Sequence, residues 1–260
     1  LPFIVQPDVT QPLTATNFML DAFHALSSSN RKMITDNFIV GASYGGALQM
    51  PSPYSLTFSE GSYYNDNPSL LAQDLVDLCT DDLDKYYDLD IELINDKFED
   101  CATFLGEVCK ALKKLKPSCE ISHAPQPPYF TSSFSSVYMD IYNLYKEYFD
   151  WFNIQFYNNG PSGSYEEIFI QSNTAVAPNT SVLELIARGI AASYIVVGKP
   201  MNSQEGSQGY VPLTDLSKYV AQAFEESKLK DWSETGGEMI WILSLETPGI
   251  VIFNTFSMSS

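Results

Sequence analysis

Positive charge and histidine are both scarce in this sequence. Its 260 residues include 14 Lys and Arg against 32 Asp and Glu, which gives a formal net charge of −18, and only two His. Nucleic-acid phosphates and anionic membrane surfaces attract basic proteins, so this charge balance disfavours both as partners. An uncharged or cationic ligand is easier for such a chain to accommodate.

Long apolar runs are absent and cysteine is limited. No stretch approaches the roughly 20 apolar residues of a membrane-spanning helix, so no membrane span is predicted. The four cysteines, Cys79, Cys101, Cys109 and Cys119, do not have the spacing of paired zinc knuckles. With only two histidines in the chain, we expect no metal site and no cofactor. Two disulfides and four free thiols both fit the sequence.

No low-complexity linker divides the chain, and no short repeat is visible. Hydrophobic residues make up 45% of the chain, enough for a substantial core. A chain of 260 residues could form one large α/β domain or two small ones, and its length alone does not choose between them. The chain begins at Leu1, without an initiator methionine, which fits either a processed or an incomplete chain. The triplet Asn179-Thr180-Ser181 is an N-glycosylation sequon and favours a secreted or extracellular protein.

Short β-rich runs alternate with amphipathic stretches along the chain. Seven runs have strand character: Pro2–Val5, Phe38–Ser43, Tyr86–Glu92, Cys119–His123, Phe152–Tyr157, Tyr194–Gly198 and Glu238–Leu243. Apolar residues at helical spacing appear within 70–78, 104–112 and 182–186. Strand followed by helix, repeated, predicts an α/β fold with a parallel sheet, and this number of units favours a (β/α)8 TIM-type barrel.

The stretch Tyr86-Tyr-Asp-Leu-Asp-Ile-Glu92 combines strand character with a carboxylate at every second position. Alternate strand residues face opposite sides, so Asp88, Asp90 and Glu92 share one face, while Leu89 and Ile91 share the other. A calcium-binding EF-hand loop starting at Asp88 would need a glycine where Leu93 stands. A solvated acidic face and a set of acids inside a barrel both remain open.

Other strand ends carry groups that suit a ligand site. Phe38–Gly46 is a strand that ends in a glycine-rich turn, where a backbone can approach a ligand closely. Gln155 and Tyr157 share a predicted face, and Trp241 ends the last predicted strand. Taken singly, strand-end capping and core packing explain these residues better than ligand binding does.

Taken together, these segments resemble glycoside hydrolase family 18, the chitinases and their relatives, in the plant and fungal class III-type branch. The acidic strand is similar to the family's Asp-x-x-Asp-x-Asp-x-Glu, and Ser43-Tyr-Gly-Gly46 is similar to its Ser-x-Gly-Gly. Residues 123–130, 155–158, 195–200 and 237–241 resemble the ends of the family's fifth to eighth strands. The resemblance implies a single barrel domain over residues 1–260.

The resemblance implies a substrate-assisted retaining mechanism on chitin or N-acetylglucosamine oligosaccharides. Glu92 would be the general acid, Asp90 would orient the substrate's 2-acetamido group, and Asp88 would hydrogen-bond Asp90. Tyr157 would donate to the acetamido carbonyl. The implied substrate-binding residues are Gln155, Asn158, Trp241, Gly45, Gly46 and Tyr129.

Three departures from the family pattern leave a second function open. Lys85 replaces the signature's first Asp, Tyr86 replaces the glycine that follows it, and nothing precedes Pro2–Val5 in the place of a first strand. The first strand of the barrel is therefore expected to be missing or replaced. Ile250–Asn254 would fill the open edge, or the edge would pair with another copy or a partner chain. Alternatively, the native protein has an N-terminal segment that supplies the strand. A chitinase-like protein without turnover, acting as a lectin or as a structural part of an extracellular assembly, is the alternative to an endo-acting chitinase.

Overall fold

The computed structural model describes residues 3–5, 14–15, 27–37, 39, 41–46, 64, 67–79, 83–91, 98–159, 163–204, 206 and 208–241. Two compact units make up the chain. The first contains Leu1–Ala124 and Asp140–Asp150, and the second contains Pro125–Met139 and Trp151–Ser260. The single domain over the whole chain stays a prediction.

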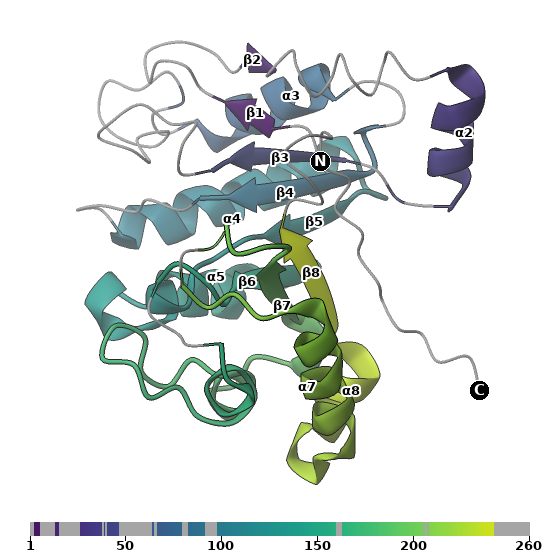
Figure 1. Ribbon diagram of the computed structural model, residues 1–260. Coiled ribbons are helices and arrows are strands. Elements are labelled where there is room, and N and C mark those ends of the chain that lie inside the picture. The colour runs from purple at the N-terminus through teal and green to yellow at the C-terminus, as the bar shows by residue number, and fades with distance from the viewer. Residues whose placement is uncertain are drawn as a thin grey trace. The chain divides into compact units, whose positions relative to one another are not determined.

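The first unit is built on parallel strands that lie side by side (Figure 1). Its strands are β1 (Phe3–Val5), β2 (Thr14–Ala15), β3 (Ala42–Gly45), β4 (Tyr86–Asp90) and β5 (Glu120–His123). β1, β3, β4 and β5 pair in this order and all in parallel, whereas β2 pairs antiparallel with β1. The short β2 therefore lies at the edge of β1 where a preceding parallel strand was expected to be missing or replaced.

Helices alternate with these strands in the chain. They are α2 (Ser28–Asn37), α3 (Pro68–Leu78) and α4 (Phe98–Leu115), and α5 (Val137–Tyr145) spans the boundary between the units. The side chain of Asn67 caps α3 by accepting a 3.1 Å hydrogen bond from Leu70 N. α3 packs against α4 and buries apolar residues at helical spacing, including Leu71 and Leu75.

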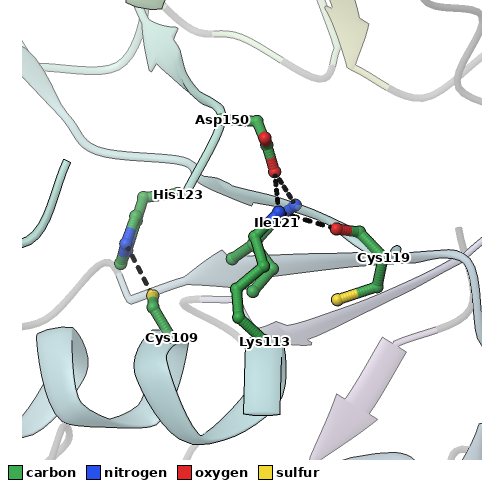
Figure 2. Close-up of polar contacts among 6 residues, drawn as sticks. All are labelled: Cys109, Lys113, Cys119, Ile121, His123 and Asp150. Carbon is green, nitrogen blue, oxygen red and sulfur yellow. Dashed lines mark hydrogen bonds and ion pairs between the residues drawn. The ribbon is translucent and has the colours of Figure 1, made fainter. Parts of the chain in front are cut away.

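The start of β5 is held by an ion pair between two other segments of the first unit (Figure 2). Lys113 Nζ of α4 lies 2.8 Å from Asp150 Oδ2 and donates a 2.7 Å hydrogen bond to Cys119 O. The same Asp150 oxygen accepts a 2.8 Å hydrogen bond from Ile121 N. Lys113 and Asp150 therefore hold the backbone on both sides of Glu120, the first residue of β5.

The second unit contains three parallel strands in the order β6 (Trp151–Gln155), β7 (Ile195–Pro200) and β8 (Gly237–Trp241). Its α-helices are α6 (Val182–Ala187), α7 (Leu213–Glu225) and α8 (Lys230–Thr235). Its shorter helical segments are η3 (Pro127–Phe130), η4 (Ser132–Phe134), η5 (Glu166–Ile170), η6 (Ala192–Tyr194) and η7 (Ser227–Leu229).

Capping and packing explain where the helices of the second unit lie. Ser181 and Glu184 form a capping box at the start of α6, which satisfies backbone N–H groups at both positions. The buried indole of Trp232 on α8 donates a 3.0 Å hydrogen bond to Ile195 O, where β7 begins. The Trp232 side chain thus anchors α8 to the sheet of the same unit.

Seven parallel strands separated by helices confirm the predicted alternation, and the three predicted helical stretches fall within α3, α4 and α6. Strand ends differ by a few residues. The largest shift is at β3, which begins at Ala42 rather than Phe38, and Ile39 within the predicted run is exposed. At Gly41 a Cβ would lie 1.8 Å from Tyr86 O, so only glycine lets the chain approach β4 there. The predicted run Ile250–Asn254 lies outside the described residues.

All four cysteines are free and buried, which decides between the two alternatives that the sequence left open. Among the described residues, no helix is long and apolar enough to cross a membrane.

Candidate active site

Three polar side chains from neighbouring strands form a row across the first unit. The register pairs Ser43 of β3 and Ser122 of β5 with Asp88 of β4. Paired residues of adjacent strands project to the same face of a sheet. The Asp88 carboxylate accepts a 2.8 Å hydrogen bond from Ser43 Oγ at Oδ2 and a short one from Ser122 Oγ at Oδ1.

This row explains how the sheet tolerates a buried acid. Asp88 is only 6% exposed, and an ionised carboxylate is costly to bury unless it is hydrogen-bonded. Hydroxyl groups from both neighbouring strands supply such bonds, and hydrogen bonds to a charged acceptor are stronger than those between neutral groups. Hydrogen bonds from both neighbouring strands therefore stabilise the Asp88 side chain at this buried position.

Asp90 follows Asp88 on the same face, beside the glycine-rich turn. It is 1% exposed and pairs with Gly45 in the register of β3 and β4. Gly45 and Gly46 have φ values of 121° and 89°, in the region that favours glycine, and Gly46 N donates a 2.8 Å hydrogen bond to Asp90 O. The turn therefore brings a backbone without side chains close to Asp90.

The opposite face of β4 is apolar and also buried. Tyr87, Leu89 and Ile91 are each no more than 2% exposed. Because Asp88 and Asp90 are buried on the other side, the solvated acidic face that the sequence left open is wrong for these two acids. The Tyr87 hydroxyl is buried without a hydrogen-bond partner among the described residues, and burial raises its pKa.

Two residues near these acids bear on the predicted mechanism. Glu92, the predicted general acid, lies outside the described residues. Lys85 is exposed in the turn before β4, where its carbonyl accepts a 2.8 Å hydrogen bond from Glu120 N. The lysine that replaces the first signature acid therefore projects into solvent.

In the second unit, Gln155 and Tyr157 are buried at the end of β6. Gln155 is the last residue of the strand and pairs with Gly198 of β7. Tyr157 follows in a tight turn, in which its N–H donates a 2.8 Å hydrogen bond to Gln155 O. β6 ends at Gln155, so the alternation of side chains along the strand does not extend to Tyr157. The prediction that Gln155 and Tyr157 share one face therefore cannot rest on alternation alone.

Asn158 continues the same turn with a φ of 60°, a conformation that Asn adopts more readily than most residues. Its side chain is exposed, and its backbone N–H donates a 3.0 Å hydrogen bond to Gln208 O. In this conformation Asn158 closes the turn after β6 against the loop around Gln208.

The other predicted substrate contacts of the second unit have different surroundings. Tyr129 is buried in η3, with ring centroids 5.2 Å from Phe134 and 6.3 Å from Tyr138. Trp241 ends β8, where its backbone pairs with Pro200; its side chain lies outside the described part of the structure. The roles of all these residues in substrate binding stay predictions.

A Cys–His pair near the acidic strand has the residue types of a nucleophilic site but not its electrostatics. Cys109 Sγ of α4 lies 3.3 Å from His123 Nε2 of β5, with both residues buried (Figure 2). Burial raises the pKa of the Cys109 thiol and lowers the pKa of His123 to about 3. Both groups are neutral near pH 7, so the pair lacks the thiolate of a catalytic cysteine.

A surface cleft of about 470 Å³ in the second unit involves other residues. Thr131, Ser136, Glu184 and Arg188 are among those that line it. The Arg188 guanidinium donates to Asn179 O at 2.9 Å and to Phe130 O, so it is already engaged with the backbone. None of the predicted site residues lines this cleft.

Reasoning from the sequence missed Tyr86 and Ser122 as members of the site. The Tyr86 hydroxyl lies 2.7 Å from Ser122 Oγ, which in turn bonds Asp88. A signal for Ser122 was available, because it is central in the predicted strand Cys119–His123, next to the acidic strand. Tyr86 was noted only as a departure from the family pattern.

No protein-family model matches the chain, and no curated protein does. Solved structures do match. A Streptomyces coelicolor protein assigned as Chitinase A is 16% identical with a TM-score of 0.65, over 92% of this chain and 80% of that chain. The ICChI chitinase of Ipomoea carnea is 19% identical with a TM-score of 0.51, over 93% of this chain and 82% of that chain. Active domain 2 of a Pyrococcus furiosus chitinase is 16% identical with a TM-score of 0.53, over 92% of this chain and 72% of that chain.

At these identities the likeness concerns the fold. The chain has the α/β fold of the TIM-barrel chitinases, with parallel strands alternating with helices.

Proposed function

We propose that the protein is a glycoside hydrolase of family 18 that cleaves chitin internally, at β-1,4 bonds between N-acetylglucosamine units. One observation carries the proposal. In a chain with the chitinase fold, the strand that resembles the family's acidic signature buries Asp88 between Ser43 and Ser122, with Asp90 beside a glycine turn. Buried acids are costly, and a cost of this kind is commonly retained for chemistry.

The proposed reaction uses the substrate's own acetamido group in place of a protein nucleophile. Glu92 donates a proton to the glycosidic oxygen as the bond to the leaving sugar breaks. Asp90 orients the 2-acetamido group, whose oxygen attacks the anomeric carbon with retention of configuration after hydrolysis. Asp88 supports Asp90 from the same face of β4.

The remaining residues of the proposal hold the sugar. Tyr157 donates a hydrogen bond to the acetamido carbonyl, and Trp241 forms an apolar floor beneath the sugar ring. The other proposed contacts come from Gln155, Asn158, Tyr129, Gly45 and Gly46.

Hydrolysis of a fluorogenic chitotrioside tests this function. We expect the unaltered protein to release the fluorophore and the Glu92→Gln variant to lose about 10²–10⁴-fold in kcat, the contribution typical of a general acid. Glu147→Gln is the matched control, because Glu147 is exposed in the segment after α5. Full activity of Glu92→Gln would remove Glu92 from the mechanism.

Binding of chitin without turnover is the second candidate. The buried Tyr86 favours it, because this large side chain stands where the family pattern has glycine, on the face that carries Asp88. Retention of chitin oligomers on a column by a protein that releases no fluorophore would support a lectin or a structural component. A partner chain or self-association at the edge of the sheet belongs to this second proposal.

A secreted or extracellular location fits both candidates. Asn179 of the sequon is exposed in a turn with a φ of 59°, immediately before the residues that cap α6. Loss of mass on treatment with an N-glycosidase, after expression in a eukaryotic secretory host, would support a glycan at Asn179. An unchanged mass would count against it.

A further inference from the structure

We propose that Tyr86, acting through Ser122, is a positioning residue for the Asp88 carboxylate. This inference rests on the proposed function, because it assigns a role within the same site. Tyr86 and Asp88 are both on β4, two residues apart and therefore on the same face, and Ser122 is the β5 residue paired with Asp88. The three side chains form one connected group inside the first unit.

The hydrogen bonds within this group have a defined donor-to-acceptor order. Ser122 has a single hydroxyl hydrogen, and Ser122 Oγ donates it to Asp88 Oδ1. The Tyr86 hydroxyl lies 2.7 Å from Ser122 Oγ and must then be the donor of the hydrogen bond between them. The chain of hydrogen bonds therefore runs from Tyr86 to Ser122 to Asp88.

Burial makes this direction persistent. Tyr86 is 1% exposed, and Ser122 and Ser43 are also buried, so water competes little for these hydroxyl groups. Without Tyr86, the Ser122 hydroxyl could rotate toward other acceptors. With it, the Ser122 oxygen is occupied as an acceptor and its hydrogen is held on Asp88.

The consequence concerns the orientation of Asp88. One carboxylate oxygen is held from β5 by Ser122, and the other is held from β3 by Ser43 at 2.8 Å. Bonds to both oxygens from opposite sides resist rotation of the carboxylate plane. In the proposed reaction, the support that Asp88 gives Asp90 would depend on this fixed orientation.

The tyrosine that departs from the family pattern thereby acquires a function. A glycine at position 86 could not donate to Ser122. Tyr86 thus supports turnover, although its size had favoured the binding candidate.

The same strand offers a matched control. Tyr87 follows Tyr86, is equally buried at 1% exposed, and faces the opposite side of β4. Its hydroxyl has no hydrogen-bond partner among the residues that the structure describes. Replacing either tyrosine by phenylalanine removes one hydroxyl and keeps the ring, so only the hydrogen bond distinguishes the two variants.

The test measures kcat and KM on the chitotrioside for the full chain and its variants. We expect Ser122→Ala to lower kcat by about 10- to 100-fold, the equivalent of one hydrogen bond to a charged group. Tyr86→Phe should lower kcat by about 3- to 10-fold, the equivalent of one hydrogen bond between neutral groups, and both variants should change KM little. Tyr87→Phe should keep the kcat of the unaltered protein. Ser122→Thr, which retains a hydroxyl, should recover most of the loss.

Non-additivity is the second expected signature. The double variant Tyr86→Phe/Ser122→Ala should lose no more kcat than Ser122→Ala alone, because Tyr86 reaches Asp88 through Ser122. The inference is overturned if Tyr86→Phe retains full kcat, if Tyr87→Phe loses as much, or if the two losses multiply.

A stability measurement separates failure of this inference from failure of the proposed function. If the unaltered protein shows no turnover, the hydrolase proposal fails, and thermal unfolding then tests the hydrogen-bond group. Tyr86→Phe should lower Tm by about 2–4 °C in the unaltered background, the shift expected for loss of one hydrogen bond in a chain of this size, and by clearly less in an Asp88→Asn background. Equal shifts in both backgrounds would overturn the inference.

Discussion

At the scale of single residues, the charged and polar groups of β4 were predicted more completely than those of its neighbours. Alternation along one strand was sufficient to predict that Asp88 and Asp90 share a face away from Leu89. The hydroxyl groups that hold Asp88 belong to other strands, and their positions depend on the register between strands. A single sequence does not specify that register, so the pairing of Ser122 with Asp88 was missed, although Ser122 lies within a predicted strand.

His123 gives a residue-scale prediction for stability against pH. Burial lowers its pKa to about 3 in the folded state, from a usual value near 6.5. Between these values the unfolded chain binds more protons, so the free energy of unfolding should fall as the pH falls through this range. The contribution of this one group approaches 1.4 kcal/mol per pH unit well inside the window.

Chemical denaturation at several pH values between 4 and 7 measures this effect. A His123→Asn variant lacks the titrating group, so its free energy of unfolding should decrease less steeply toward acid. Parallel curves for the two proteins would contradict the assignment. The carboxylates present in both proteins supply the common background.

At the scale of helices and strands, element type was predicted well and element ends less well. Hydrophobic periodicity marks the interior of α3, α4 and α6, where side chains face a core. The ends depend on local contacts, such as the Asn67 cap of α3 and the close approach of Gly41 to β4. The antiparallel β2 has two residues, too few for any periodicity to show.

The Lys113–Asp150 pair at the start of β5 gives an element-scale prediction. Asp150→Ala removes the acceptor for both Lys113 Nζ and Ile121 N, and it should lower the free energy of unfolding by about 1–3 kcal/mol. The control is Asp215→Ala, because its pair with Lys218 is exposed and exposed pairs contribute about 0–1 kcal/mol. Urea denaturation compares the two, and equal losses would show that the β5 contacts add nothing.

At the scale of the whole molecule, the order of strands and helices was enough to predict the fold class. Seven parallel strands alternating with helices favour a barrel, and the likeness to chitinase structures extends over 92% of the chain. Activity was not predictable in the same way, because one fold supports many functions.

The path of the chain between its two units leads to a whole-molecule prediction. Each unit combines two separate segments, so the chain passes between the units after Ala124, Met139 and Asp150. Neither unit can be formed from one continuous piece of chain. We therefore expect one cooperative unfolding transition, with calorimetric and van't Hoff enthalpies that agree. Two resolved transitions would show that the units unfold independently.

The four buried thiols have a practical consequence. No disulfide joins them, so folding of the chain does not depend on disulfide formation. Burial also raises the pKa of Cys79 to about 12 and that of Cys119 to about 11, which leaves few reactive thiolates at neutral pH. The folded protein should therefore behave alike in a glutathione-rich cytoplasm and in an oxidising medium.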